Sequence, residues 1–406
     1  MIFKYKGVIV AVNTPETYNI ETEVNELKEL AESIDIEIVG MHVQNRSRQD
    51  RKYYAGSGFL NEVREMYEEI DYVIVNDEIL ASQNRNIEAL FDASVVDRTQ
   101  VILDIFSQRA KSREGKLQVE LAQLNYLVPR LRGQGINLSR LGAGIGTRGP
   151  GETKLETDRR HIGERIKEVK HQLKTIEKHR ESYREDRNKT LVTKFSLIGY
   201  TNAGKSALFN TLTEADELQE DKLFATLDPK TKRLEFNTGF QVLLTDTVGF
   251  IQKLPTMLVE SFKSTLEEAA DSDFLIHVID NSNPDIMSQY RTVKELIHEL
   301  GMEDIPQLVC FNKSDLNSEI RFIPEERYTF TNYNMNKEAI KSELLSLIEA
   351  HYIPFKRHLT MADTNELYTL KRDTYVKNEV FNEDSLEYDI EGYTKHMSIV
   401  KRTLKE

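Results

Sequence analysis

One eight-residue stretch has the residue types and the spacing needed to hold the phosphates of a nucleotide. It reads Gly-Tyr-Thr-Asn-Ala-Gly-Lys-Ser over residues 199–206. In such a loop, backbone N–H groups surround phosphate oxygens, the lysine reaches the β- and γ-phosphates, and the serine hydroxyl binds Mg²⁺. An apolar run at 195–198 precedes it and a helix-like segment at 207–212 follows, which is the context that this motif requires. The predicted phosphate-binding residues are Gly199, Tyr200, Thr201, Asn202, Ala203, Gly204, Lys205 and Ser206.

A second motif, Asp-Thr-Val-Gly at residues 246–249, ends a strand of the buried type that starts at residue 241. We expect Asp246 near the Mg²⁺ and the amide of Gly249 near the γ-phosphate, with Thr247 and Val248 in the same nucleotide-binding loop. Thr226, between the two motifs, stands where a switch threonine closes on Mg²⁺ and the γ-phosphate. The predicted metal ligands are Ser206, Thr226 and Asp246, and the predicted catalytic residues are Lys205, Thr226 and Gly249.

A third motif, Asn-Lys-Ser-Asp at residues 312–315, selects the base and follows an apolar strand at 307–311. The Asp315 carboxylate can accept hydrogen bonds from N1–H and the exocyclic amine of guanine, a pair of donors that adenine lacks. Asn312 and the stem of Lys313 are expected to support the ring. Each motif alone is more often an ordinary loop, but all of them in this order at strand ends indicate a GTP-binding domain.

Two positions depart from the common GTPase pattern. Thr331-Asn332 stands where a Ser-Ala loop usually contacts guanine through its backbone. Phe250 directly follows the Asp-x-x-Gly motif, where many GTPases carry a glutamine that orients the attacking water. An apolar ring cannot position water, so the missing group comes from elsewhere in the protein or from a partner. Alternatively, Phe250 packs beneath the switch and another residue substitutes. Both interpretations predict slow hydrolysis by the isolated protein.

The composition limits the class of protein. With 406 residues the chain exceeds what one core usually supports, so we expect two or three domains. No apolar run approaches the ~18 residues needed to span a bilayer, and residues 1–13 turn polar too soon for a signal peptide. Cys310 is the only cysteine, so no internal disulfide is possible. We expect a cytoplasmic monomer in which Cys310 and His277, both in apolar strands, are core residues rather than catalysts.

The net charge of −13 argues against a general nucleic-acid binder, but the charge is unevenly distributed. Residues 109–189 contain 20 Lys and Arg against 11 Asp and Glu, an excess of +9, which leaves −22 on the rest of the chain. This asymmetry indicates one limb that binds a polyanion on an otherwise acidic body. The alternative is a solvated, charged coiled coil.

Hydrophobic periodicity within this basic region predicts two long helices. Apolar residues recur at spacings of three and four from Leu117 to Leu131 and again from Leu155 to Ile176, which fits an antiparallel helical hairpin. Between them, residues 131–153 hold seven of the 19 glycines together with Arg132, Arg140 and Arg148. A flexible, cationic loop on a stiff arm suits the irregular phosphate surface of folded RNA, whereas a disordered linker would need no helical stalk.

The remaining sequence predicts an α/β multidomain fold. Residues 1–110 alternate expected strands at 8–12, 36–39, 72–75 and 101–105 with helices near 22–33 and 57–70, which predicts a small parallel α/β domain. The hairpin occupies 111–190, and a P-loop GTPase domain with a mostly parallel sheet spans 191–354. Pro354 marks the expected boundary to a small α+β appendage at 355–406.

These segments together resemble the HflX family of ribosome-associated GTPases over nearly the whole chain. The residues that carry the resemblance are Val-Asp-Arg-Thr at 96–99, Asp-Ile-Phe-Ser-Gln-Arg-Ala at 104–110, Arg-Glu-Gly-Lys-Leu-Gln-Val-Glu-Leu-Ala at 113–122, Gly-Pro-Gly-Glu-Thr-Lys-Leu-Glu-Thr-Asp-Arg-Arg at 149–160 and Asp-Thr-Val-Gly-Phe-Ile-Gln-Lys-Leu-Pro at 246–255. Phe59 departs from the family, which usually has lysine there, so a nucleotide role for the N-terminal domain is not implied.

The resemblance implies a GTPase that binds the large ribosomal subunit and its RNA, is stimulated by ribosomes, and in several members splits stalled ribosomes. Mg²⁺ is the implied cofactor and GTP the substrate. Two other functions stay open: a ribosome-assembly or RNA-chaperone GTPase without splitting activity, and a regulatory switch that binds a partner through its coiled coil. The sequence does not distinguish a general rescue factor from a heat-stress factor or an antibiotic-resistance paralogue.

Overall fold

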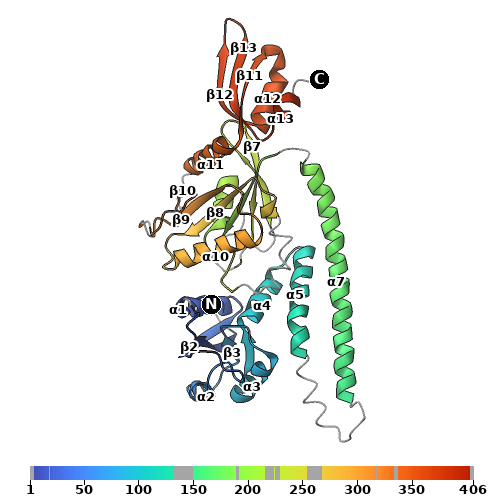
Figure 1. Ribbon diagram of the computed structural model, residues 1–406, viewed down its shortest axis with the longest axis vertical. Coiled ribbons are helices and arrows are strands. Elements are labelled where there is room, and N and C mark those ends of the chain that lie inside the picture. Colours follow the sequence, from blue (N-terminus) through green and yellow to red (C-terminus); the bar gives the residue numbers. More distant parts are fainter. Residues whose placement is uncertain are drawn as a thin grey trace. The chain divides into compact units, whose positions relative to one another are not determined.

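The computed structural model describes residues 4–17, 19–131, 150–188, 192–214, 224, 229–253, 268–316, 319, 321–332 and 337–402. The chain forms two compact units, one of Met1–Ile176 with Gln252–Phe262 and one of Glu177–Ile251 with Lys263–Glu406 (Figure 1). Three sheets alternate with helices along the chain, which confirms the predicted α/β multidomain class. No helix in the described part of the chain is long and apolar enough to cross a membrane.

The first unit starts with a four-stranded parallel sheet of order β2-β1-β3-β4. Its strands and helices are β1 (Tyr5–Asn13), α1 (Ile20–Glu32), β2 (Ile36–Asn45), α2 (Ser57–Glu65), β3 (Tyr72–Val75), α3 (Ala81–Phe91), β4 (Ser94–Asp97) and α4 (Arg98–Arg109). Residues 8–12 of β1 are buried on both faces, as expected for a central strand of a parallel sheet. The valines at 8, 10 and 12 pack on α2 and α3 through Leu60, Val63 and Ile87.

The expected strand at 101–105 is wrong, because these residues lie in helix α4. The fourth strand ends at Asp97, whose side chain accepts a hydrogen bond from the backbone N–H of Gln100 at 2.9 Å and so caps the helix. Val101, Ile102 and Ile105 are all buried. A short helix that is apolar on nearly every side has no visible helical period, so its sequence resembles that of a buried strand.

Two long helices follow, α5 (Arg113–Leu131) and α7 (Pro150–Asn188). They run side by side in Figure 1. The Arg165 guanidinium of α7 donates to both carboxylate oxygens of Glu120 of α5 at 2.6 and 2.9 Å, which joins the two helices. Helix α7 already includes residues 150–153, so the loop predicted for 131–153 is too long at this end. Pro150 suits the first position of a helix because proline has no N–H to leave unpaired. Arg132, Arg140 and Arg148 lie outside the described residues.

Asp97 also joins helix α5 to the N-terminal sheet. Its Oδ1 accepts a hydrogen bond from the Tyr126 hydroxyl at 2.8 Å, and its Oδ2 accepts one from the Arg130 guanidinium at 2.8 Å. Arg130 also donates to the carbonyl of Ile79 at 3.0 Å and stacks on the Tyr126 ring, 3.4 Å from its centre. Since Asp97 is only 1% exposed, this charge pair is a buried joint that fixes the end of α5.

The second unit contains a six-stranded sheet of order β10-β9-β8-β5-β7-β6, in which β6 alone runs antiparallel to its neighbour. Its described elements are β5 (Lys194–Gly199), α8 (Lys205–Thr213), β6 (Lys230–Glu235), β7 (Gln241–Asp246), β8 (Phe274–Asp280), α10 (Ile286–Glu299), β9 (Gln307–Asn312), β10 (Arg327–Phe330) and α11 (Lys337–His351). The central strands β5, β8 and β9 are almost wholly buried, so the sheet forms a rigid platform for the loops at its edge.

A three-stranded antiparallel sheet of order β11-β13-β12 completes this unit. Its elements are β11 (Ile353–Thr360), the 3₁₀ turn η1 (Met361–Asp363), α12 (Thr364–Asp373), β12 (Tyr375–Asn382), β13 (Glu387–Thr394) and α13 (Met397–Arg402). Pro354 lies inside β11 and is paired with Tyr393. The helices α12 and α13 pack on this sheet through Leu367, Leu370 and Val400.

Candidate nucleotide site

The loop at 199–206 joins strand β5 to helix α8 and lies in close contact with the ends of strands β8 and β9. A Cβ atom on Gly199 would lie 2.2 Å from the carbonyl oxygen of Val278 in the adjacent strand. Gly204 has a φ of +92°, and a Cβ there would lie 2.1 Å from the Asn312 amide nitrogen. Only glycine fits at both positions, so the sequence keeps the loop tight and its backbone accessible to a ligand.

Lys205 opens helix α8 and points back into the loop. Its Nζ donates hydrogen bonds to the carbonyl oxygens of Gly199 at 3.1 Å and Tyr200 at 2.7 Å, and the residue is only 6% exposed. Burial lowers the pKa of Lys205 to about 8, against the opposing attraction of the Asp246 carboxylate. The loop therefore holds a desolvated cation that an anionic phosphate would stabilise.

Ser206 and Asp246, two of the three predicted metal ligands, meet at the carboxyl ends of β5 and β7. The Ser206 hydroxyl donates to Oδ2 of Asp246 at 2.7 Å, and Asp246 is 1% exposed. A hydroxyl and a carboxylate are hard oxygen ligands of the kind that Mg²⁺ takes together with substrate phosphates, so these residues fit that ion. No three His, Cys, Asp or Glu side chains gather as a metal cage within the described ranges. Thr226 lies outside those ranges.

The Asp-Thr-Val-Gly-Phe segment is bound directly to the phosphate loop. The backbone N–H of Phe250 donates to the Gly199 carbonyl at 3.1 Å, and the Thr201 N–H donates to the Phe250 carbonyl at 2.7 Å. A Cβ on Gly249 would lie 2.9 Å from Cα of Thr201 and 3.0 Å from Nζ of Lys205. The predicted catalytic residues Gly249 and Lys205 are thus neighbours, and glycine is needed at 249 for the close approach.

The Phe250 ring is 1% exposed and packs in the core. Of the two interpretations of this position, the burial agrees with the one in which the ring packs within the fold, while the switch around Thr226 lies outside the described residues. Thr247 anchors the same segment from the other side, because its hydroxyl donates to the Leu197 carbonyl at 2.6 Å. These hydrogen bonds tie the segment to the phosphate loop and to strand β5 on its N-terminal side, and a buried phenyl ring offers no group that could orient water.

The base-selecting motif is tied to the phosphate loop by two side chains. Asn312 at the end of β9 donates from Nδ2 to the Ala203 carbonyl at 3.0 Å. Lys313 donates to the Asn202 carbonyl at 2.9 Å and to Oδ2 of Asp280 at 2.8 Å. These contacts hold the Lys313 side chain against the phosphate loop, and Asp315, two residues further along the chain, is exposed. Asp280 was not predicted from the sequence, although its position at the end of an apolar strand could have indicated it.

The Thr331-Asn332 loop lies beside this motif, as a guanine-contacting loop must. The backbone N–H of Ser314 donates to the Thr331 carbonyl at 3.1 Å. In the described part of the chain, Oγ1 of Thr201 and Oδ1 of Asn312 are buried polar atoms without a hydrogen-bond partner. Buried polar groups are nearly always paired, so these two atoms indicate a polar ligand between the phosphate loop and the base motif.

His277 and Cys310 are buried core residues away from this chemistry. Burial raises the pKa of the Cys310 thiol to about 12, so it is no nucleophile. Burial lowers the pKa of His277 to about 3, and its ring stacks on Tyr290 with centres 5.4 Å apart. The Nδ1 atom of His277 has no hydrogen-bond partner among the described residues, so this histidine is not fully satisfied.

Three protein-family models match the chain in sequence. They are described as GTP-binding GTPase N-terminal at residues 21–107, GTP-binding GTPase Middle Region at 109–187, and 50S ribosome-binding GTPase at 194–313.

Curated relatives match over most of their length. The GTPase HflX of Alkalihalophilus pseudofirmus is 47% identical over 397 residues, which cover 96% of this chain and 94% of the relative. That of Escherichia coli K12 is 41% identical over 313 residues, covering 77% and 73%. A solved GTP-binding protein from Sulfolobus solfataricus in complex with GDP is 23% identical, covers 84% of this chain and 98% of its own, and has a TM-score of 0.46.

Proposed function

This chain belongs to the HflX family of GTPases, and we propose that it binds the large ribosomal subunit, is stimulated by ribosomes and splits stalled ribosomes. GTP binding is common to the family, and the match to a 50S ribosome-binding GTPase model supports the ribosome as partner. Such a protein would act in the cytoplasm, as a monomer, on the ribosomal particles found there.

Within this proposal each residue of the candidate site has a role. The loop at 199–206 would hold the phosphates, with Lys205 on the γ-phosphate, and Thr247 and Val248 would keep the Gly249 amide beside it. Ser206, Asp246 and Thr226 would hold Mg²⁺, which neutralises phosphate charge when bound. Asn312, Lys313 and Asp315 would select guanine. The hydrogen bond of 2.7 Å between Ser206 and the buried Asp246 supports this assignment, because it brings a hydroxyl and a carboxylate together at the end of the loop.

The observation that carries the ribosome proposal is a basic stripe on helix α7. Arg160, Lys167 and Lys174 are exposed and spaced by seven residues, so they lie on one face of the helix. Seven residues rise about 10 Å along a helix, so these side chains could each contact a different phosphate of a folded RNA. Residues 159–178 contain seven Lys and Arg against three Asp and Glu. The stripe points toward RNA rather than toward a partner helix, which would need an apolar face.

Sedimentation with intact ribosomes, with and without a non-hydrolysable GTP analogue, tests the proposal. Loss of the intact-ribosome peak supports splitting, and binding to one subunit alone would instead support an assembly role. No comigration would refute ribosome binding. Replacing Arg132, Arg140 and Arg148 together by alanine should leave GTP binding intact and lower the salt slope of ribosome binding by about 2.

The matched control removes three exposed cations from the C-terminal sheet region, Lys356, Arg372 and Lys377. It changes the net charge equally, so a general charge effect would weaken both variants alike. Light scattering of ribosomes mixed with each GTP-loaded protein then reports splitting directly. Equal splitting by the wild type and the Arg132/Arg140/Arg148 variant would contradict a role of these arginines.

A further inference from the structure

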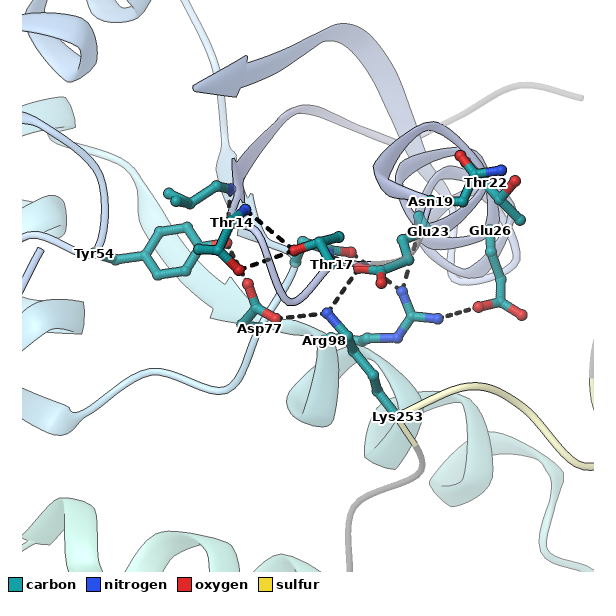
Figure 2. Close-up of polar contacts among 12 residues, drawn as sticks. Thr14, Thr17, Asn19, Thr22, Glu23, Glu26, Tyr54, Asp77, Arg98 and Lys253 are labelled. Atoms are coloured by element: carbon teal, nitrogen blue, oxygen red, sulfur yellow. Dashed lines mark hydrogen bonds and ion pairs between the residues drawn. The ribbon is translucent and has the colours of Figure 1, made fainter. Parts of the chain in front are cut away.

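A second polar site lies at the carboxyl edge of the N-terminal sheet, between strands β1 and β3. In the order β2-β1-β3-β4, the chain forms β2 on one side of β1 and then crosses over to form β3 on the other side. The carboxyl ends of β1 and β3 are therefore a topological switch point. Open α/β sheets bind their ligands in the crevice at such a point. Here the carboxylates of Glu23 in helix α1 and Asp77 in the loop after β3 lie close together, within 2.8 Å of one ammonium nitrogen (Figure 2), and we call the space between them the Glu23–Asp77 crevice.

Both carboxylates are held by buried partners. Glu23 is 5% exposed, and its Oε2 accepts a hydrogen bond from Nδ2 of the fully buried Asn76 at 2.7 Å. Arg98 fixes this pair, donating at 3.2 Å both to the backbone carbonyl of Glu23 and to Oδ1 of Asn76. Oδ2 of Asp77 accepts from the Tyr54 hydroxyl at 2.6 Å. The two carboxylates of the crevice are therefore held in place by buried hydrogen bonds and form a preformed pair of acceptors.

The occupant of this crevice is the ammonium group of Lys253. Its Nζ lies 2.7 Å from Oε2 of Glu23 and 2.8 Å from Oδ1 of Asp77 (Figure 2). Burial alone would lower the pKa of Lys253, but the hydrogen bonds to Asp77 and Glu23 outweigh it and raise the pKa, so the group is charged. Lys253 also has a φ of +54°, a conformation that non-glycine residues adopt only where the surroundings impose it.

Lys253 belongs with Gln252–Phe262 to the first compact unit, whereas Ile251 and the preceding residues belong to the second. Phe250, only three residues earlier, is bonded through its backbone to Gly199 and Thr201 of the phosphate loop. Three residues span at most about 11 Å. Holding the Lys253 side chain therefore limits where Phe250 and the neighbouring Gly249 can move, through the covalent chain alone.

We propose that Lys253 is a positioning residue for GTP hydrolysis, and that the Glu23–Asp77 crevice is its receptor. The receptor fixes the end of the segment that carries the Gly249 amide, and so limits the positions of that amide relative to the γ-phosphate. Catalysis depends steeply on such geometry, because errors near 1 Å in the position of a reacting group can cost up to a hundredfold in rate. The inference rests on the GTPase activity of the chain and not on its binding to ribosomes.

The test is single-turnover GTP hydrolysis by the full chain without ribosomes. Lys253→Met keeps the length of the side chain and removes its charge, and we expect the rate to fall roughly three- to tenfold while GTP affinity changes less than about twofold. Lys253→Arg should restore most of the rate. Lys377→Met is the matched control, since Lys377 forms a 2.7 Å ion pair with Glu349 and is similarly exposed but lies on the C-terminal sheet.

A double-mutant cycle with Asp77→Asn shows whether the two residues act as one unit. The double variant should be no slower than Lys253→Met alone, because both changes break the same contact. Melting temperatures identify any variant that fails to fold; if Lys253→Met is one, the rate of Asp77→Asn relative to Lys377→Met decides, because Asp77→Asn removes the same ion pair from the other side. Rates of Lys253→Met equal to those of Lys377→Met, or effects of Lys253 and Asp77 that simply multiply, would overturn the proposal. Ribosome binding plays no part in these measurements, so its failure would be recognised separately.

Discussion

The low pKa of Lys205 predicts that GTP binding takes up a proton. Burial places this pKa at about 8 in the nucleotide-free protein. At about pH 8.5 only about a quarter of the molecules then carry a charged Lys205. Bound phosphates stabilise the ammonium form, so each GTP that binds should take up about three quarters of a proton. At about pH 7 the group is already charged, and uptake by Lys205 should fall to about a tenth of a proton.

The sign of the affinity change follows from the same linkage. Because nucleotide binding raises the pKa of Lys205, the affinity is fully present below about pH 8 and is lost as the pH rises above it. Between about pH 7 and pH 9 the loss should reach roughly tenfold, or about 1.4 kcal/mol. The wild-type protein at two pH values serves as its own control for the other groups in the site.

Titration calorimetry in two buffers of different ionisation enthalpy measures the proton uptake, and fluorescence titration with a labelled guanine nucleotide measures the affinity. Lys205→Arg is the matched variant, since a guanidinium stays charged throughout this range and should show no rise in uptake with pH. Equal uptake at about pH 7 and pH 8.5, together with a flat affinity, would refute the reasoning. The phosphate loop would then not hold a desolvated ammonium in solution.

Three further perturbations test other parts of the fold. Asp315→Asn should weaken the binding of GTP by at least ~2 kcal/mol and favour xanthosine triphosphate, whose base presents a carbonyl to the new amide. If the variant still prefers GTP in competition binding, the assignment of Asp315 to the base is wrong. His277 has a pKa of about 3 in the fold against an ordinary 6.5, so stability is full above about pH 6.5 and is lost as the pH falls toward 3. Between about pH 7 and pH 4, the free energy of unfolding of His277→Phe should fall by about 3 kcal/mol less than that of the wild type, as measured by denaturant unfolding. Parallel pH profiles of the two proteins would show that His277 does not cause the loss of stability in acid. Asp97→Asn leaves Arg130 without its buried counter-charge and should cost about 3 kcal/mol and speed amide exchange in α5 without changing GTP affinity; unchanged exchange would show that the joint is not where α5 is held.

Sequence alone predicted the parts of the site whose chemistry is local along the chain. The phosphate loop needs eight consecutive residues, and the motifs at 246–249 and 312–315 follow the apolar strands β7 and β9, which belong to the same sheet with β5 and β8 between them. Parallel strands of one sheet bring their carboxyl ends to the same edge, so the gathering of Lys205, Asp246 and Asn312 followed from the order of elements. The packing of Phe250 was only one of two interpretations, because a side chain does not reveal from sequence what it packs against.

Contacts between distant residues could not be predicted in this way. Lys253 and Glu23 are 230 residues apart, and lysine and glutamate are ordinary surface residues whose pairing leaves no pattern. The contacts of Asp97 could not be predicted either. Its partners Tyr126 and Arg130 lie on a helix whose sequence pattern, the apolar period, says nothing about what its polar side chains contact. The mistaken strand at 101–105 has the same origin, since burial from several sides removes the period that distinguishes a helix.

The buried joint at Asp97 has a consequence for how this protein can diverge. Arg130 is anchored directly before the last residue of α5, and the Glu120–Arg165 pair holds α7 against α5 independently of the chain that connects them. None of these contacts involves residues 132–149, so an exchange of residues within that segment should leave the Asp97 joint and the Glu120–Arg165 pair in place. Variants that differ there are thus expected to keep the same anchoring of α5 and α7. The same independence makes this segment a suitable place to insert a label or to graft the corresponding segment of a relative.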